Sequence, residues 1–259
     1  MKKIEIERTK AIIEPSDIIR KKIAFPEIGV SCFSLNLIKK TAERYGGERI
    51  GSLITVAGRV PIYKIICNDA VSQKMLPIAL IPAAIGAPAC AAVFEEVIAM
   101  GLKKLVQFGS CGLLVPDIPE GTMIIPTAAI REEGTSYHYL PPSEEIEVGA
   151  EAIDLLEGIF EAKGVRYIKG KTWTTDAVYR ETYEKADRYK ETGAVCVEME
   201  CAAMLAVAAY REVEFVPFFF CADSLAGKAW DPRNLGSPEL HNDERAMLLA
   251  LAAAVAEKK

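Results

Sequence analysis

Residues 195–204, Val-Cys-Val-Glu-Met-Glu-Cys-Ala-Ala-Met, place two acids directly after a short apolar run. Residues 194–197 are apolar enough for a buried strand, and residues 201–209 are small and apolar enough for a packed helix. Glu198 and Glu200 therefore fall at a strand end, where open α/β sheets bind their ligands. The same pattern also fits a plain strand-to-helix turn with Glu200 at the helix N-terminus, stabilised by the helix dipole. The stretch alone leaves a ligand site and a structural turn both open.

Outward from this stretch, strand and helix patterns alternate along the chain. We predict strands at residues 28–32, 53–57, 61–67, 76–81, 104–108, 123–126, 165–172, 194–197 and 213–221. Helices are predicted at 35–45, 86–100, 150–162, 182–189, 201–209 and 240–257, with a short helix starting at Pro15-Ser16-Asp17. Gly58 predicts a hairpin between residues 53–57 and 61–67. The alternation, without a repeat or a linker, predicts an α/β fold with one domain over residues 1–259 and a mixed, mostly parallel sheet.

The composition excludes several classes of protein. The 259 residues are 51% hydrophobic and 26% charged, which indicates a compact globule with a substantial core. The net charge of -5 and the lack of a basic stripe argue against a nucleic-acid partner. Seven cysteines lie scattered in apolar runs and only two histidines occur, so we expect reduced thiols and no metal site. Neither a signal peptide nor a bilayer-length apolar run is evident, which predicts a soluble, cytoplasmic protein without a membrane partner.

Three further stretches share the pattern of polar residues after an apolar run. They are Gln107-Phe108-Gly109-Ser110-Cys111-Gly112, Thr174-Thr175-Asp176-Ala177-Val178-Tyr179 and Cys221-Ala222-Asp223-Ser224. In this order, and together with Glu198-Met199-Glu200, they resemble the signatures of the nucleoside phosphorylase-I family, which includes purine nucleoside and uridine phosphorylases. The resemblance implies a single three-layer αβα domain around a twisted, mixed central sheet. It also implies cleavage of a nucleoside N-glycosidic bond, with phosphate as co-substrate and no other cofactor.

The resemblance implies a role for each acid. Cleavage builds positive charge on the ribose, which a carboxylate near the sugar hydroxyls can stabilise. Glu200 matches the acid that accepts hydrogen bonds from the ribose, with Glu198 beside it and Met199 as an apolar wall under the sugar. Asp223 matches the acid that stabilises or protonates the departing purine, which needs a raised carboxyl pKa. A cap on the following turn is the plainer interpretation of Asp223.

Further binding residues are implied by the same matches. Thr175, Val178 and Tyr179 match the base pocket, although Val178 stands where the purine branch has an aromatic residue. Residues 109–112 leave a predicted strand, and a tight turn there would form an anion nest of backbone N–H groups. Ser110 and Gly109 would then contact phosphate or ribose, with Gln107 standing where an arginine is usual.

Two residues outside these stretches complete the predicted site. The loop at 131–142 resembles the Arg-x-x-Gly-x-Ser-x-His loop of the uridine branch, which makes His138 a candidate site residue. A solvated or interfacial histidine is the alternative. The family completes each site from a neighbouring subunit, so we expect a homo-oligomer, a hexamer or a dimer, with Arg49 as the donated residue. Arg233 or Arg245 is a candidate partner for Asp223.

Three functions remain open from the sequence. The first is phosphorolysis of a purine nucleoside or uridine, with Asp223 favouring purine and His138 favouring uridine. The second is hydrolysis by water, because the phosphate-binding arginines are not evident and residues 31–35 (Ser-Cys-Phe-Ser-Leu) stand where the family has a Gly-Asp-Pro loop. The third is a binding relative without catalysis, against which the presence of Glu200 and Asp223 argues.

Overall fold

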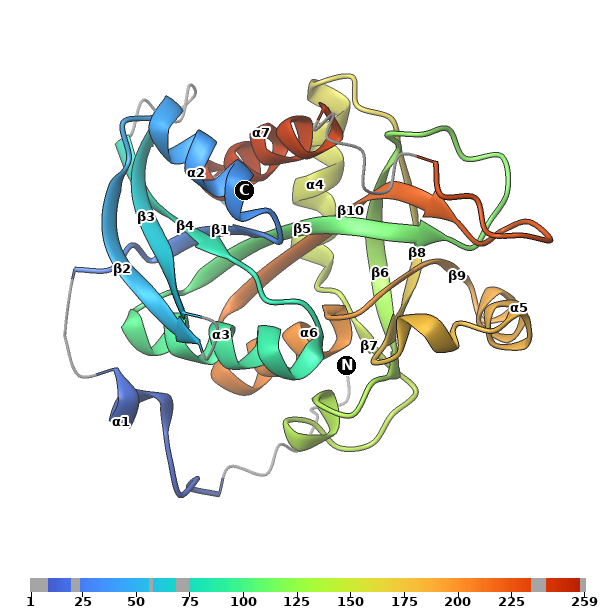
Figure 1. Ribbon diagram of the computed structural model, residues 1–259, viewed down its shortest axis with the longest axis horizontal. Coiled ribbons are helices and arrows are strands. Elements are labelled where there is room, and N and C mark those ends of the chain that lie inside the picture. Colours follow the sequence, from blue (N-terminus) through green and yellow to red (C-terminus); the bar gives the residue numbers. More distant parts are fainter. Residues whose placement is uncertain (1–8, 20–23, 56–57, 69–74, 234–240, 257–259) are drawn as a thin grey trace.

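A computed structural model describes residues 9–19, 24–55, 58–68, 75–233 and 241–256 of the chain. Within them one mixed sheet contains every strand (Figure 1). The strands are β1 (Ile28–Cys32), β2 (Glu48–Thr55), β3 (Gly58–Asn68), β4 (Met75–Pro82), β5 (Lys104–Leu113), β6 (Met123–Glu132), β7 (Glu145–Glu147), β8 (Tyr167–Thr175), β9 (Ala194–Glu198) and β10 (Glu214–Ser224).

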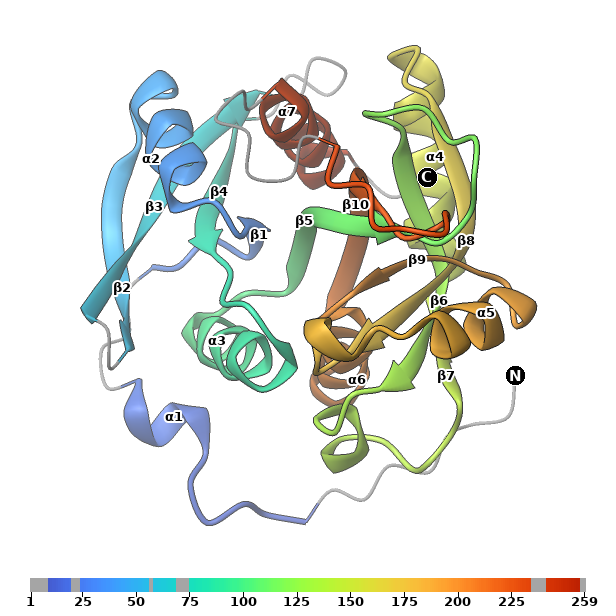
Figure 2. The ribbon, with the colours of Figure 1, turned by 45° about the vertical axis from the view of Figure 1, so that its right-hand side comes forward.

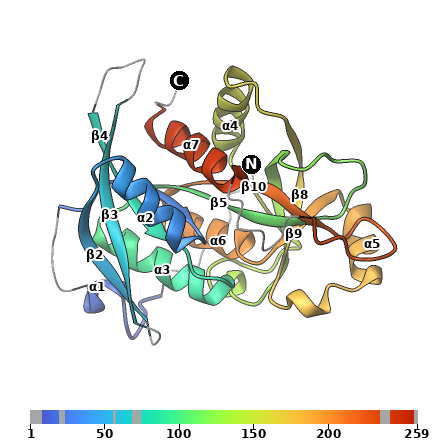
Figure 3. The same cartoon turned by 45° about the horizontal axis from the view of Figure 1, so that its top comes forward.

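Helices cover both faces of this sheet. On one face lie α2 (Leu35–Arg44), α4 (Ala150–Ala162) and α7 (His241–Val255), and on the other lie α3 (Ala87–Met100) and α6 (Cys201–Arg211) (Figures 1 and 3). The short α1 (Pro15–Ile18), α5 (Tyr183–Glu191) and the 3-10 turns η1 (Ser136–His138) and η2 (Val178–Arg180) lie at the periphery. The predicted three-layer α/β architecture is confirmed. No helix in the described part of the chain is long and apolar enough to cross a membrane.

The sheet also closes partly on itself. Its order is β10-β6-β8-β9-β5-β1-β4-β3-β2, and β10 additionally pairs with β5. Five strands (β10, β6, β8, β9 and β5) therefore form a closed ring, from which β1, β4, β3 and β2 extend as an open wing (Figure 2). β5 belongs to both parts. Because ring and wing meet there, β5 is the strand on which a site can draw side chains from both.

Side-chain hydrogen bonds explain where α2 and α5 start. Ser34 precedes α2 and its hydroxyl accepts from the Leu37 N–H at 3.2 Å, while Thr182 does the same for Lys185 at the start of α5. Such caps satisfy N–H groups that the first helical turn leaves free. Most residues of α6 are small and apolar. Those from Cys201 through Ala208 are buried between the sheet and α3. This confirms the packed helix expected after the two acids.

Several strands extend past their predicted ends. β6, β8 and β10 each run three or more residues further, which places Thr174, Thr175 and Asp223 inside strands rather than in loops. The extension follows from pairing, since β8 is paired by β6 on one side and β9 on the other. The short β7 was not predicted and pairs with β6. The predicted hairpin is confirmed as the antiparallel pair β2–β3, with residues 56 and 57 outside the described residues.

Candidate active site

The edge of β5 that faces β1 and β9 is open over a short length. Ser31 of β1 pairs with Gln107, and Val197 of β9 pairs with Gly112. β10 follows the other edge of β5 throughout. Between Gln107 and Gly112, no described strand pairs with β5 on the first edge, and a narrow cavity lies beside this gap. Its lining comprises Phe33, Gln107, Phe108, Gly109, Ser110, Glu198, Glu200, Cys201, Phe215, Pro217 and Phe219.

Glu198 is buried at the end of β9, and the chain itself satisfies its carboxylate. Oε1 accepts from the hydroxyls of Thr172 at 3.2 Å and Thr174 at 2.6 Å. Oε2 accepts from the backbone N–H groups of Glu200 and Cys201, both at 2.7 Å. Burial raises the pKa of Glu198, and these donors oppose the rise. Because four donors use about all the lone pairs of a carboxylate, Glu198 fixes the turn from β9 into α6. Its predicted contact with substrate stays a prediction.

Glu200 lies at the N-terminus of α6 and lines the cavity. Its Oε1 accepts from the backbone N–H of Gly86 at 2.5 Å, and Gly86 is itself the residue before α3. One carboxylate therefore lies at the N-termini of two helices, whose dipoles favour negative charge. Burial, followed by the charge of Glu198, nevertheless raises the pKa of Glu200 to about 8. Met199 between the two acids is half-buried.

The predicted tight turn at residues 109–112 is wrong. These residues continue β5 and pair with β10 from Gly109↔Phe219 to Gly112↔Asp223. In an extended strand successive N–H groups point to opposite edges, so they do not converge into the predicted anion nest. The sequence could not reveal this, because the extension depends on pairing with β10, which lies about a hundred residues further along the chain.

The side chains around this part of β5 are largely apolar. Ser110 is exposed and lines the cavity, whereas Gln107 is buried and its Nε2 donates to the Cys90 sulfur at 3.4 Å. A Cβ on Gly109 would lie 2.7 Å from the ring of Phe33, so the ring rests directly on this glycine. A second cavity adjoins the first and is lined by Cys32, Phe33, Ser34, Leu37, Phe108, Gly109, Ser110 and Phe220. Neither lining includes a Lys or Arg among the described residues.

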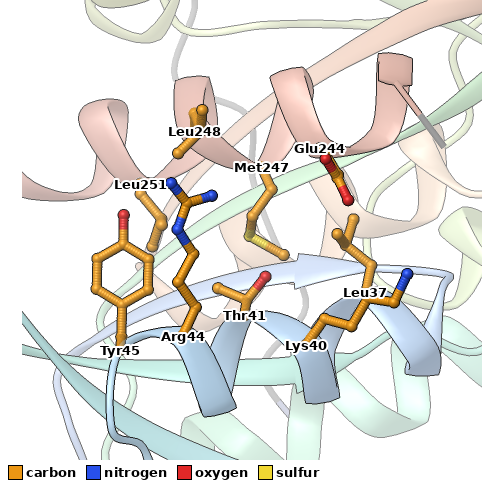
Figure 4. A pocket seen from close by; sticks show the side chains of 9 residues that line it. All are labelled: Leu37, Lys40, Thr41, Arg44, Tyr45, Glu244, Met247, Leu248 and Leu251. Atoms are coloured by element: carbon orange, nitrogen blue, oxygen red, sulfur yellow. The ribbon is translucent and has the colours of Figure 1, made fainter.

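Cationic side chains gather instead in a separate hollow between α2 and α7 (Figure 4). Leu37 lines both this hollow and the second cavity, so α2 forms the wall between them. The hollow is lined by Leu37, Lys40, Thr41, Arg44, Tyr45, Glu244, Met247, Leu248 and Leu251. The charges of Lys40 and Arg44 therefore lie on the α7 side of α2 and not beside Ser110.

Asp223 stands near the end of β10, where the strand is bulged between Cys221 and Asp223. Its Oδ2 accepts from the indole N–H of Trp230 at 2.7 Å. Burial raises the pKa of Asp223, while the Trp230 N–H and the charge of Arg233 oppose the rise. The Nη1 of Arg233 is buried and has no hydrogen-bond partner in the described part of the chain. Arg233 is thus the nearby cation that the sequence suggested, and Trp230 is a contact that it missed.

The register of the sheet brings Asp223 close to the end of β9, which leads to Glu198 and Glu200. Gly112 pairs with Asp223 on one side and with Val197, which precedes Glu198, on the other. Asp223 and Val197 are thus two strand spacings apart, about 10 Å. A Cβ on Gly112 would lie 3.4 Å from Asp223 Oδ1 and 2.4 Å from the side chain of Leu225, so both side chains pack closely on this glycine.

The predicted base-pocket residues lie at the end of β8 and on the 3-10 turn that follows it. Thr175 is buried and its hydroxyl accepts from the Ala177 N–H at 3.2 Å, while Val178 and Tyr179 on η2 are exposed, Tyr179 almost completely. Glu181, which we did not predict, follows η2. Burial and the charge of Asp223 raise the pKa of Glu181 to about 7. Its signal in the sequence was an acid two residues after the motif.

His138 and Arg49 lie away from the cavity of the same chain. His138 is exposed on η1, whose neighbour Tyr139 packs its ring against Tyr210 at 5.6 Å. Tyr210 is about 15 Å along α6 from Glu200. Arg49 is exposed on β2, at the outer edge of the wing, where its Nη2 donates to Ser52 at 2.6 Å. One described chain therefore does not bring either residue to Glu200.

All seven cysteines are free and buried. Across the residues that the structure describes, no group of three or more His, Cys, Asp or Glu side chains is arranged to hold a metal ion.

The amino-acid sequence is similar to those of several known nucleoside phosphorylases. The chain is 33% identical over 128 residues to a guanosine phosphorylase of Halorubrum lacusprofundi, covering 48% of this chain and 52% of that protein. It is 33% identical over 135 residues to a uridine phosphorylase of Thermococcus kodakarensis, covering 51% and 47% respectively. A purine nucleoside phosphorylase of Plasmodium falciparum is 28% identical over 190 residues, covering 64% and 76%. The chain thus spans about half the length of the first two relatives.

Solved structures share the fold over nearly the whole chain. A uridine phosphorylase from Vibrio fischeri superposes with a TM-score of 0.75 at 17% identity, covering 95% of this chain and 99% of that one. A purine nucleoside phosphorylase from Toxoplasma gondii in complex with immucillin-H gives a TM-score of 0.74 at 18% identity, covering 95% and 97%. A model of the phosphorylase superfamily matches residues 47–257. With the four ordered motifs, the fold and this match, the chain belongs to the phosphorylase superfamily.

Proposed function

We propose that the protein cleaves the N-glycosidic bond of a nucleoside, with Glu200 at the ribose and Asp223 at the base. One observation carries the proposal: Gly112 has Asp223 on one side and the end of β9, which leads to Glu200, on the other. The spacing of about 10 Å between these strands suits a ligand that has a sugar at one end and a base at the other. Glu198 supports the arrangement by fixing the turn that carries Glu200.

The chemistry follows from these positions. The C1′–N bond breaks, its electron pair stays on the base nitrogen, and the ribose gains positive charge as the nucleophile forms a new bond to C1′. An ionised Glu200 stabilises that charge through the ribose hydroxyls. The base leaves more readily when it receives a hydrogen bond or a proton at a ring nitrogen. Asp223 can supply either when its carboxyl is protonated, and burial raises its pKa in that direction.

We favour a purine nucleoside as substrate, with uridine as the alternative. Asp223 supports purine, because the resemblance assigns the acid at this position to the purine ring. The relatives include proteins named for guanosine, purine nucleosides and uridine, so their names do not separate the two. The exposure of His138 and its distance from Glu200 weaken the single feature that pointed to uridine.

For the nucleophile we favour phosphate, as in the enzymes for which these relatives are named. The reaction then needs no cofactor beyond phosphate as co-substrate. Phosphate carries about -1.5 to -2 charges near neutral pH and is usually held by arginine. Because the linings of the two cavities beside β5 hold neither Lys nor Arg, this proposal requires a cation from outside those cavities of one chain.

Hydrolysis by water is the second candidate, and Phe33 is the observation that favours it. The Phe33 ring rests on Gly109 and occupies space beside Ser110 where an anion would lie. Two buried acids, Glu198 and Glu200, line the same cavity and would repel phosphate when they are ionised. Water carries no charge and needs no such cation. The two candidates share every other feature of the site.

The proposal of phosphorolysis is linked to assembly. We propose a homo-oligomer, a hexamer or a dimer, in which Arg49 of one subunit reaches the site of another. The position of Arg49 supports this, since it is exposed on the edge strand β2 and lies outside its own cavity. An isologous contact between two such edges would complete both sites at once.

The experiment is a nucleoside screen with product identification. The purified chain is incubated with inosine, guanosine, adenosine and uridine in phosphate-free buffer and again with millimolar phosphate. Base release that requires phosphate, with ribose 1-phosphate seen by phosphorus NMR, is the expected result. Base release at the same rate without phosphate, with free ribose as product, would identify a hydrolase. If no nucleoside releases base in either buffer, the proposed function is wrong.

A further inference from the structure

Asp223, the acid that we propose lies at the base, accepts a hydrogen bond from a tryptophan side chain. Trp230 donates its indole N–H to Asp223 Oδ2 at 2.7 Å. Tryptophan offers a donor and no acceptor, so it can hold a carboxylate but cannot take or give its proton. The other oxygen, Oδ1, lies against Gly112, at 3.4 Å from where a Cβ would stand. The two carboxylate oxygens therefore have different surroundings.

The loop that carries Trp230 is fixed at three points. Ser224 and Asp231 exchange two backbone hydrogen bonds, both of 2.9 Å, which close the base of the loop. The Ser224 hydroxyl accepts from the Ala226 N–H at 3.3 Å. Tyr183, the first residue of α5, donates its hydroxyl to the Lys228 carbonyl at 2.8 Å. These bonds set the position of the indole independently of its contact with Asp223.

We propose that Trp230 is a positioning residue for Asp223, which holds one carboxylate oxygen so that the acid meets the departing base in a fixed orientation. The inference rests on the proposed cleavage of a nucleoside and adds to it a residue that no sequence motif identified. Trp230 is 58% exposed, so its ring contributes less to the core than a buried tryptophan would. The loop bonds place the indole, and its hydrogen bond to Asp223 is the polar contact that the N–H makes there.

The charged groups around Asp223 define what the hydrogen bond does. Arg233 favours the ionised form of Asp223, whereas Asp231 and Glu181 oppose it. Burial has the largest effect and raises the pKa of Asp223, and the Trp230 N–H partly offsets that rise. Removing the N–H while keeping an aromatic ring should therefore raise the pKa of Asp223 further.

The test compares two substrates in Trp230→Phe. One is the nucleoside that the wild type cleaves best, and the other is p-nitrophenyl β-ribofuranoside, whose leaving group departs as a stable anion without a proton. We expect kcat for the nucleoside to fall about 10- to 100-fold, the usual effect of a lost hydrogen bond to a charged group. The p-nitrophenyl substrate should be nearly unaffected, and the pH limb due to Asp223 should move to higher pH. Tyr45→Phe, at the residue that follows α2, is the matched control.

Equal losses on both substrates would mean that Trp230 only supports the fold, and unchanged kinetics would also overturn the inference. A second measurement does not depend on activity. The chain has two tryptophans, so ¹⁵N-indole labelling gives two N–H signals, and Trp230→Phe identifies one of them by its loss. That signal should move in Asp223→Asn and titrate with Asp223 in the wild type. A signal that does neither contradicts the inference, whether or not the wild type cleaves nucleosides.

Discussion

At the scale of single residues, two acids separated by one residue have different tasks. Glu198 accepts four hydrogen bonds from the chain and is fully used in holding the turn after β9. Glu200 accepts from the backbone N–H of Gly86, and its carboxylate lines the cavity. Glu198 is the last residue of β9, whereas Glu200 has left the strand and stands directly before α6. Glu198 therefore fixes the turn, and Glu200 is the acid that we propose binds the ribose.

Glu198→Leu should destabilise the fold strongly. The substitution leaves the buried N–H groups of Glu200 and Cys201 without an acceptor, at about 1–3 kcal/mol for each. We expect the free energy of unfolding in urea to fall by about 2–5 kcal/mol. Glu198→Gln is the matched control, because its amide oxygen can still accept from both N–H groups and the threonine hydroxyls can turn to accept from its amide. A loss as large in Glu198→Gln as in Glu198→Leu would contradict this account.

Glu200 should give the fold a distinctive pH dependence. Its folded-state pKa of about 8 lies above its unfolded value, so between the two the folded chain holds a proton that the unfolded chain has lost. The stabilising contribution is full below the unfolded pKa and is lost as the pH rises to about 8. Glu200→Gln removes this contribution. Its free energy of unfolding should therefore fall less than that of wild type between pH 5 and pH 8.5. Parallel stability curves for the two proteins would show that Glu200 does not titrate in this window.

At the scale of elements, the packed helices α3 and α6 are tied near both ends. At their N-termini, the Glu200 carboxylate binds the Gly86 N–H. At the other end of α6, Arg211 Nε donates to Glu95 on α3 at 2.6 Å, and its Nη2 donates to Glu14 beside α1 at 3.1 Å. The position of Glu200 therefore depends on how α3 and α6 pack, and not only on its own turn.

Arg211→Ala should loosen this helix pair. It leaves the largely buried Glu95 carboxylate without its cation, and because Arg211 is partly exposed we expect a loss of about 1–3 kcal/mol rather than the cost of a fully buried pair. Lys64→Ala breaks the more exposed pair with Glu48 and should cost about 0.5 kcal/mol or less. Adding Glu95→Gln to Arg211→Ala should recover part of the loss. No recovery in the double variant would show that the charge of Glu95 is not the cause.

The elements also show how much of the fold can be predicted from the sequence. Apolar periodicity predicts β1, β9, α3, α6 and the β2–β3 hairpin, because local sequence determines which face of each is buried. It does not predict the length of β5 or the bulge before Asp223, because both depend on which strand lies alongside. The same distinction applies to the residues of the candidate site. Glu200 and Asp223 follow from motifs, whereas Trp230 and Glu181 reach Asp223 only through the packing of a loop and of η2 on the ring of strands.

At the scale of the whole molecule, the ring carries the acids and the wing carries Arg49. The outer strand β2 pairs only with β3 within the described sheet, so its other edge is open to a partner. Ile54 on β2 is also 70% exposed. This edge is the natural place for the contact between subunits that our proposal of phosphorolysis requires.

Mixing two inactive variants tests the sharing of sites. If Arg49 acts on a neighbour, Arg49→Ala and Glu200→Ala remove residues from opposite sides of the contact. Dissociating and reassembling the two together should restore part of the phosphate-dependent activity, because some mixed sites then contain both native residues. Each variant reassembled alone is the control. Mixed oligomers that stay inactive, or an active monomer in light scattering, would rule out a shared site.

The most direct test of the central claim is the rate of base release by Glu200→Ala, measured on the best nucleoside beside the wild type. Glu200 is proposed to stabilise charge that develops on the ribose in the transition state, so its loss should reduce kcat by about 10²–10³. Circular dichroism and urea unfolding of the same sample establish that the variant is folded. A folded Glu200→Ala that releases base at nearly the wild-type rate would contradict the assignment of this cavity as the site of glycosidic cleavage.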